Sequence, residues 1–183
     1  MSERARVRRT VVVLPLVCGL LLTGSACGGG GGGKKEKAEA TPTSSAERQK
    51  FAKTRFVANA GLAAGAAYQW IIKPYRNGAF RKGADGRTGA LVKAGLAGAF
   101  TYNRLKAATR NAQGDPTLAK ALAPVNSGID SLKNLGTKLR KGDANDADVN
   151  SVDKVIGQVK DAGRSAGAPV TDKTPSVSEL QKG

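Results

Sequence analysis

Apolar residues recur every three to four positions from residue 45 to about residue 168, which is the spacing of one face of an α-helix. The alternation of β-branched and polar residues that marks a strand does not occur there. Turn residues divide this region into four predicted helices, over residues 45–73, 89–111, 116–141 and 146–165. We therefore expect an all-α fold, a small antiparallel helical bundle of about four helices over residues 46–168.

Several residues mark the expected ends of these helices. Ser44 or Ser45 is a suitable N-cap for the first helix, and Glu47 falls in its first turn. Pro74 should end or kink that helix, because proline lacks the N–H that the helical ladder needs. Pro124 should kink or split the third helix for the same reason.

Small residues repeat in the first two helices. Gly61 and Gly65 lie four positions apart, and Gly95 and Ala99 repeat this spacing 34 residues later. Small residues at this spacing let helix backbones approach closely. We expect the first two helices to pack face to face along these positions. Residues 56–72 carry no charge, which favours a buried helix and leaves a membrane-inserted one as the alternative.

The N-terminal residues have the organisation of an export signal. Residues 1–9 hold four arginines against one acid, and residues 10–23 are uncharged and mostly apolar. This apolar run is too short to cross a bilayer as a helix. The small residues Gly24, Ser25 and Ala26 follow, as a cleavage site requires. We interpret residues 1–26 as a signal peptide.

The sequence Gly24-Ser25-Ala26-Cys27 resembles the lipobox of bacterial lipoproteins, although Gly24 stands where the lipobox usually has an aliphatic residue. The glycine tract that follows is similar to that of actinobacterial lipoproteins. The resemblance implies lipid attachment at Cys27 and an anchor in the cell membrane, on its outer face. An ordinary secreted protein is the alternative, and the export route, general secretory or twin-arginine, stays open.

The segments that flank the predicted bundle have the composition of linkers. Residues 27–45 combine the lipid-attachment cysteine with glycines, charged residues and a Thr-Pro-Thr-Ser-Ser run, which predicts a flexible tether. Residues 169–183 contain Pro169 and Pro175 among scattered Ser and Thr, and we expect a disordered tail there.

The chain is strongly basic, with a net charge of +16. Removing residues 1–26 takes four Arg and one Glu from 30 basic and 14 acidic residues, which leaves 26 and 13 and a net charge of +13. Such a domain is expected to bind anionic surfaces, either lipid head groups or cell-wall polymers. Nucleic acid is not an expected partner, because no nucleic-acid motif is found and the signal directs the chain out of the cytoplasm. A protein partner cannot be named.

One predicted loop concentrates cations beside aromatic residues, a combination that suits phosphate or anionic-sugar binding. The alternative is a solvated basic loop whose aromatics cover one end of the bundle. The candidate anion-binding residues are Lys73, Arg76, Arg81, Lys82 and Arg87, and the candidate aromatic contacts are Trp70, Tyr75 and Phe80.

Catalytic chemistry finds little support in the sequence. The chain has no histidine, which excludes Ser-His-Asp and Cys-His catalysis and His-ligated metals. Residues 143–148 contain several acids but fail the spacing of a calcium loop, and we expect them to serve the N-terminus of the fourth helix instead. We predict a non-enzymatic binding or structural protein without a cofactor or metal. The alternative is a bundle that binds a small molecule near Tyr68, Trp70 and Tyr102.

Overall fold

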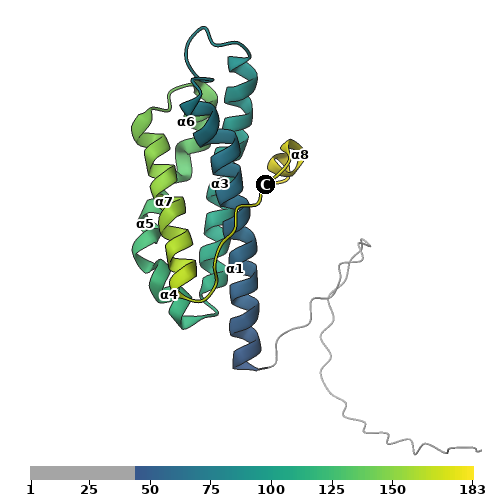
Figure 1. Cartoon of the computed structure of the whole chain (residues 1–183), viewed down its shortest axis with the longest axis vertical. Coiled ribbons are helices and arrows are strands. Elements are labelled where there is room, and N and C mark those ends of the chain that lie inside the picture. The colour runs from purple at the N-terminus through teal and green to yellow at the C-terminus, as the bar shows by residue number, and fades with distance from the viewer. Residues whose placement is uncertain (1–43) are drawn as a thin grey trace, which may run out of the picture. The chain divides into compact units, whose positions relative to one another are not determined.

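The computed structural model describes residues 44–183, which all belong to one compact unit of the chain. The predicted signal peptide, Cys27 and the glycine-rich tether lie outside the described residues. Figure 1 shows the described part as a bundle of long helices with a short helix at the C-terminus.

Within residues 44–183 the structure is helical and contains no strand, which confirms the predicted all-α bundle. The chain rises through α1, descends through α3, rises through α4 to α6 and descends again through α7 (Figure 1). The elements are α1 (Ser45–Ala67), the π turn η1 (Tyr68–Ile72), α2 (Lys73–Arg76), α3 (Arg87–Ala112), α4 (Pro116–Leu122), the 3₁₀ turn η2 (Ala123–Val125), α5 (Asn126–Ser131), the 3₁₀ turn η3 (Leu132–Asn134), α6 (Leu135–Lys141), α7 (Asp146–Ser165) and α8 (Val177–Gln181).

Side chains cap the first and last long helices. The Glu47 backbone N–H donates to Ser44 Oγ at 3.1 Å, and the Ser44 N–H donates to Glu47 Oε2 at 3.0 Å. Asn145 and Asp148 form the same reciprocal pair at the start of α7, with both distances at 3.1 Å. These capping boxes satisfy N–H groups that a helix leaves unpaired. They confirm the predicted N-cap of the first helix and the predicted role of the acids at the fourth.

Pro74 does not end the first helical path but stands at the start of α2, directly after a π turn. The π turn Tyr68–Ile72 precedes it, and the Lys73 N–H bonds to the carbonyl of Tyr68, five residues earlier. A π turn widens the helix locally and so accommodates a residue that cannot donate a hydrogen bond. The helical path therefore continues to Arg76, three residues beyond the predicted end.

The third predicted helix is split, as expected at Pro124. The 3₁₀ turn Ala123–Val125 separates α4 from α5, and a second 3₁₀ turn, Leu132–Asn134, separates α5 from α6. The apolar stripe keeps facing the interior in spite of these changes. Its buried members are Leu118, Leu122, Val125, Ile129, Leu132, Leu135 and Leu139.

The core is built mainly from Ala, Leu, Val and Ile, with Phe56 and Phe100 as the only buried aromatic side chains in the described part of the chain. Alanine and glycine on α1 and α3 allow these two helices to pack along much of their length. A core of small side chains stabilises the fold through close backbone approach and contact area rather than through bulk.

The glycines predicted to lie between α1 and α3 have other partners. A Cβ atom added at Gly61 would lie 2.5 Å from the Thr171 carbonyl oxygen, and one at Gly65 would lie 2.1 Å from that of Lys173. A Cβ added at Gly95 would instead lie 3.0 Å from the carbonyl oxygen of Gly136 on α6. The predicted packing of α1 against α3 is confirmed, but the prediction that it runs along these glycines is wrong. The spacing of the small residues correctly predicted that another backbone packs closely against these positions, but it does not indicate which segment that backbone belongs to.

The prediction of a disordered tail over residues 169–183 is also wrong. Residues 166–176, which we call the C-terminal strap, turn at residues 166–167 and then run along α1 without helix, and α8 follows them (Figure 1). The Lys173 N–H donates to the Gly61 carbonyl at 2.9 Å, and Pro175 and Leu180 are buried. Polar residues and prolines suggested disorder, but the two α1 glycines provide a channel in which such a chain packs without bulky side chains.

No helix among residues 44–183 combines the length and the apolar character that crossing a membrane requires. The uncharged run 56–72 instead contributes buried residues to the bundle core, including Phe56, Ala63 and Ile71.

Candidate functional site

Five of the eight residues predicted to form one basic and aromatic site are divided between two pockets at the loop end of the bundle. Tyr75, Phe80 and Arg81 line one pocket, and Trp70 and Lys73 line the other. Arg76, Lys82 and Arg87 line neither of these pockets. The cations of the loop therefore do not form a single anion-binding site.

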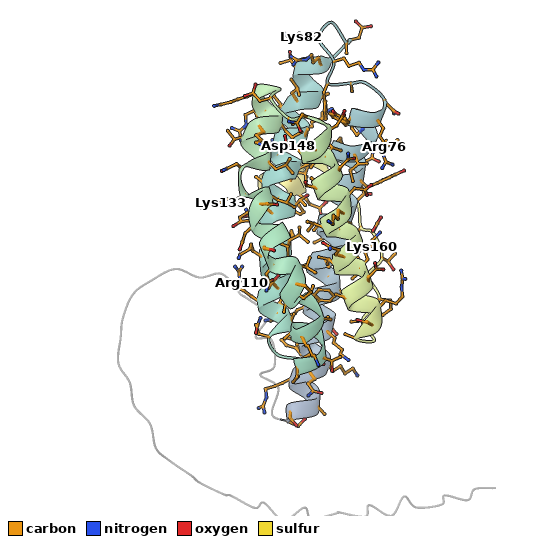
Figure 2. All side chains as sticks on the ribbon, turned by 90° about the vertical axis from the view of Figure 1, so that its left-hand side faces the viewer. Arg76, Lys82, Arg110, Lys133, Asp148 and Lys160 are labelled. Atoms are coloured by element: carbon orange, nitrogen blue, oxygen red, sulfur yellow. The ribbon has the colours of Figure 1, made fainter. Side chains whose placement is uncertain are left out.

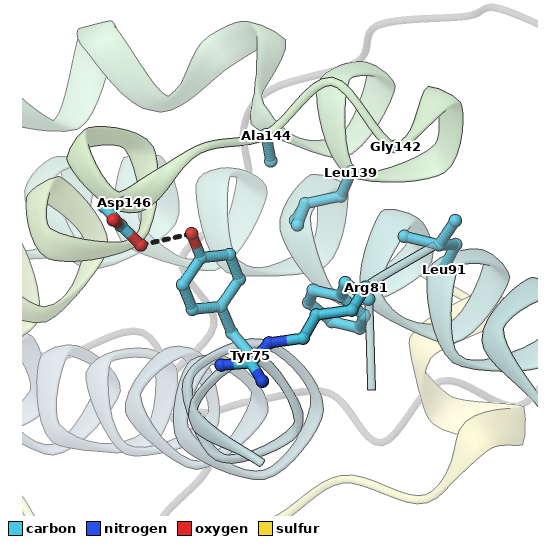
Figure 3. A pocket seen from close by; sticks show the side chains of 8 residues that line it. Tyr75, Arg81, Leu91, Leu139, Gly142, Ala144 and Asp146 are labelled. Atoms are coloured by element: carbon cyan, nitrogen blue, oxygen red, sulfur yellow. Dashed lines mark hydrogen bonds between the residues drawn. The ribbon is translucent and has the colours of Figure 1, made fainter. Parts of the chain in front are cut away.

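The first pocket, which we call the tyrosine pocket, has a volume of about 360 Å³. Leu91 and Leu139 form an apolar wall, and the Tyr75 hydroxyl points at the Asp146 carboxylate across the opening (Figure 3). Phe80 packs edge-on against Tyr75, with ring centroids 6.0 Å apart. The other lining residues of the tyrosine pocket are Arg81, Gly142 and Ala144.

Asp146 makes the tyrosine pocket a poor receptor for an anion. Its Oδ1 accepts a hydrogen bond from the Tyr75 hydroxyl. This bond, together with burial and the negative charge of Asp146, raises the pKa of Tyr75 above its ordinary value, so the phenol stays neutral. A carboxylate at the mouth repels a second negative charge, which offsets the attraction of Arg81. The pair fastens the end of α2 to the start of α7 and thus has a structural role.

Arg87 is also committed to the fold. Its Nε donates to the Phe80 carbonyl oxygen at 2.9 Å and so holds the loop against α3. A Cβ atom added at Gly142 would lie 2.6 Å from the Arg87 Nη2, so the guanidinium occupies the space beside that glycine. Gly142 itself has φ of 78°, a conformation that glycine adopts without strain.

The second pocket, which we call the tryptophan groove, has a volume of about 570 Å³ and lies between residues 69–79, whose helical part ends at Arg76, and the start of α3. It contains two lysines, one from each side, and no acidic residue. Its lining residues are Gln69, Trp70, Lys73, Pro74, Asn77, Ala79, Gly86, Gly89, Ala90 and Lys93.

Trp70 forms the aromatic part of the tryptophan groove. Its Nε1–H donates to the Pro175 carbonyl oxygen of the C-terminal strap at 3.1 Å. The Lys93 ammonium lies 5.9 Å from the ring centroid, within the range of a cation–π interaction. Because the indole N–H is already bonded, the ring presents only apolar surface to an occupant of the groove.

The remaining predicted cations lie on the outer surface. The Arg76 guanidinium pairs with Asp153 of α7 at 2.9 Å, and both side chains are more than half exposed. Lys82 is exposed at the loop end of the bundle, as Figure 2 shows. Arg76 is thus neutralised in part, whereas no ion pair within residues 44–183 involves Lys82.

Cations outnumber acids in the described part of the chain, with 23 Lys and Arg against 11 Asp and Glu in residues 44–183, and at least six of these acids form ion pairs. Figure 2 shows exposed side chains such as Arg110 and Lys133 pointing outward along the length of the bundle. The acid–cation pairs are Asp115–Lys53, Asp153–Arg76, Asp130–Lys106, Asp148–Lys138, Asp172–Lys160 and Asp161–Arg164.

Two of the four charged residues that line these pockets, Lys93 and Asp146, were not predicted as site residues from the sequence. Lys93 belongs to the tryptophan groove because Gly86, Gly89, Ala90 and Lys93 follow the three-to-four spacing of one α3 face. That face meets Trp70 only after the bundle closes. Asp146 was assigned to the start of the fourth helix, but its contact with Tyr75 depends on how α2 lies against α7.

Tyr68 and Tyr102 do not line any of the pockets described here. Tyr68 is 52% exposed, and Tyr102 is half-buried against the core. Of the three aromatic residues suggested for a small-molecule site, only Trp70 lines one of the two pockets described here.

Residues 44–183 contain no group of three or more Cys, Asp or Glu residues arranged to hold a metal ion. The fold and these sites define an all-α bundle with a strap-bound C-terminus and a basic surface. Comparisons with protein-family models, with curated protein sequences and with solved structures found no match for the chain.

Proposed function

We propose that this protein is a lipid-anchored, basic protein of the cell envelope, on the outer face of the membrane, with a non-enzymatic binding or structural role. The lipobox-like sequence before Cys27 supports the anchor. The basic helical bundle is the part that would bind an anionic surface, either lipid head groups or cell-wall polymers, both of which carry phosphate or carboxylate groups.

The excess of unpaired surface cations is the observation that carries the proposal. Residues 44–183 contain 23 Lys and Arg but only 11 Asp and Glu, and Lys82, Lys133 and Lys141 are among the cations that form no ion pair there. These side chains spread over the bundle instead of meeting in one pocket. Such a distribution suits an extended anionic surface better than a single small ligand.

A vesicle experiment tests the binding part of the proposal. A Cys27→Ser chain, which cannot be lipidated, is sedimented with phosphatidylglycerol vesicles and, in parallel, with phosphatidylcholine vesicles and purified cell-wall material. We expect retention on the anionic lipid or on the wall that falls steeply as salt rises from about 0.05 M to about 0.5 M. Equal retention on phosphatidylcholine, or none on any material, would contradict it.

Intact-mass measurement of the native, membrane-extracted protein tests the anchor. A chain that begins at Cys27 and carries the added mass of a diacylglycerol group is the expected result. Two acyl chains hold a protein stably at a membrane, whereas one holds it only marginally. A chain that begins at another residue, or an unmodified Cys27, would contradict the anchor and leave the binding result unaffected.

A small-molecule-binding bundle is the second candidate function, and the tryptophan groove favours it. The groove has the volume of a small-ligand site and combines an apolar wall with a few polar groups, as such sites do. The two functions are compatible, because the groove occupies one end of a bundle whose net charge is positive.

A further inference from the structure

We propose that the tryptophan groove binds an anion with a flat or apolar body, such as a phosphate ester carried on a ring. This inference rests on the small-molecule alternative of the proposed function and names its ligand class. The tyrosine pocket is excluded as the anion site, because Asp146 stands at its mouth.

The charge of the groove comes from two lysines on different elements. Lys73 belongs to α2 and Lys93 to α3, and both are exposed lining residues. No acid lines the groove, and no ion pair within the described residues involves either lysine. Two lysines that line one pocket without a counterion attract an anion, and charge-assisted hydrogen bonds from their ammonium groups are stronger than neutral ones.

The start of α3 adds to this positive potential. Gly86 is the N-cap of this 26-residue helix and offers no side chain to cap it. Gly86 and Gly89 line the groove, so two backbone positions at the start of α3 meet it without a side chain of their own. The N-terminus of a helix carries a partial positive charge that favours a nearby anion.

The rest of the groove selects for an apolar body beside the anion. The Trp70 ring, Pro74 and Ala90 form its apolar surface, and the Trp70 N–H is already bonded to Pro175. An inorganic ion would leave this surface exposed to water, whereas a ring or an alkyl group would cover it. The π turn Tyr68–Ile72 sets the orientation of Gln69 and Trp70 toward the groove.

Trp70 is the only tryptophan of the chain, so its fluorescence reports directly on the groove. The full chain carrying Cys27→Ser is titrated with phenyl phosphate, inorganic phosphate and phenol. We expect a saturable change in Trp70 emission with phenyl phosphate, at an affinity at least about tenfold higher than for the other two probes. Calorimetry checks the same titration without fluorescence. The absence of saturable phenyl phosphate binding, or equal affinity for all three probes, would overturn the proposal.

A matched pair of variants locates the binding. Lys73→Gln with Lys93→Gln should weaken phenyl phosphate binding by about tenfold or more, because it removes both ammonium groups. Lys133→Gln with Lys141→Gln removes the same charge elsewhere and should change the affinity by less than about twofold. An equal loss in both double variants would overturn the site. Should the first double variant fail to fold by circular dichroism, Lys93→Gln alone replaces it and a loss of about threefold or more is expected.

The source of the anion and the independence of the two proposals are settled in the same series. Displacement of phenyl phosphate by phosphatidylglycerol vesicles would identify a lipid head group as the natural source, and lack of displacement would identify a soluble ester. Either result agrees with the site. If the Lys73/Lys93 variant loses phenyl phosphate binding but is still retained on anionic vesicles, the groove is a site separate from the basic surface. If the parent chain is not retained on anionic vesicles, only the surface proposal fails.

Discussion

Gly65 lies where the C-terminal strap crosses α1, and the strap occupies the space that a side chain would need. An added Cβ would stand 2.1 Å from the Lys173 carbonyl oxygen and 2.7 Å from the Thr174 nitrogen, closer than non-bonded atoms approach. Both contacts are with backbone, which cannot rotate away as a side chain does. Glycine at this position therefore has a packing reason, although glycine is a weak helix former.

Gly65→Ala should displace the strap and lower the free energy of unfolding by about 1–3 kcal/mol, the usual range for overpacking. The loss should occur even though alanine favours the α1 helix by up to about 1 kcal/mol. Thermal unfolding measures the stability, and a red shift of Trp70 emission reports the broken bond to Pro175. Gly157→Ala is the control, because a Cβ there meets no atom within 4 Å, and it should stabilise α7. A Gly65→Ala variant as stable as Gly157→Ala would disprove the packing role of the glycine.

At the scale of the elements, the sequence predicted the helix starts and breaks that depend on residues close together in the chain. Ser44 and Glu47 lie three residues apart and form a capping box wherever a helix starts, and Pro124 splits the third helix because it removes a donor. The strap was missed because its stability comes from residues more than 100 positions away, Gly61 and Trp70. Amino-acid composition indicates whether a segment can bury enough apolar surface by itself. The strap does not need to do so, because it packs against α1 and bonds to Gly61 and Trp70.

Asp148 joins two elements, and its ionisation should be visible in the stability of the bundle. Its carboxylate caps α7 through Asn145 and accepts a hydrogen bond from Lys138 of α6 at 2.7 Å. Burial alone would raise the pKa of Asp148, but the hydrogen bonds from Lys138 and Asn145, with the Lys138 charge, lower it below 3.8. The stabilisation is therefore present above pH 3.8 and is lost as the pH falls through the lower pKa of the folded state.

Asp148→Asn should cost about 1 kcal/mol in the free energy of unfolding at pH 6, because it keeps an acceptor for the N-cap but loses the ion pair. Denaturant titrations between pH 6 and pH 3 should show the difference from the parent chain shrinking as Asp148 becomes protonated. Asp143→Asn removes the same charge from an exposed position and should have little effect at any pH. A constant difference between Asp148→Asn and the parent over the whole range would contradict the argument.

At the scale of the whole molecule, the sequence predicted the basic character of the domain but not the arrangement of its cations. The basic loop was expected to act as one site, and the structure instead directs Lys73 to the tryptophan groove, Arg81 to the tyrosine pocket and Arg76 to Asp153. Residues close in sequence point to different sides once the path 69–76 is helical and the following residues turn back. Lys93 joins the groove for the opposite reason, because the fold brings a distant residue close.

The excess of cations should make the bundle more stable at higher salt. Like charges repel over distances comparable to the Debye length, about 30 Å at 0.01 M and about 8 Å at 0.15 M, so added salt relieves repulsion across the whole domain. Salt also weakens the surface ion pairs, but each exposed pair contributes only about 0–1 kcal/mol. Repulsion among the unpaired cations should therefore dominate, and Tm should rise by a few degrees between about 0.01 M and about 0.3 M sodium chloride.

Removal of unpaired cations provides the matching control for this salt dependence. A chain with Lys133→Gln, Lys141→Gln and Lys154→Gln loses three exposed cations that form no ion pair within the described residues. Its Tm at low salt should exceed that of the parent, and its rise with salt should be smaller, because less repulsion remains to be screened. A Tm that falls with salt in the parent chain would show that the ion pairs outweigh the repulsion. In that case the cations would be balanced within the fold and would not be available to an anionic surface.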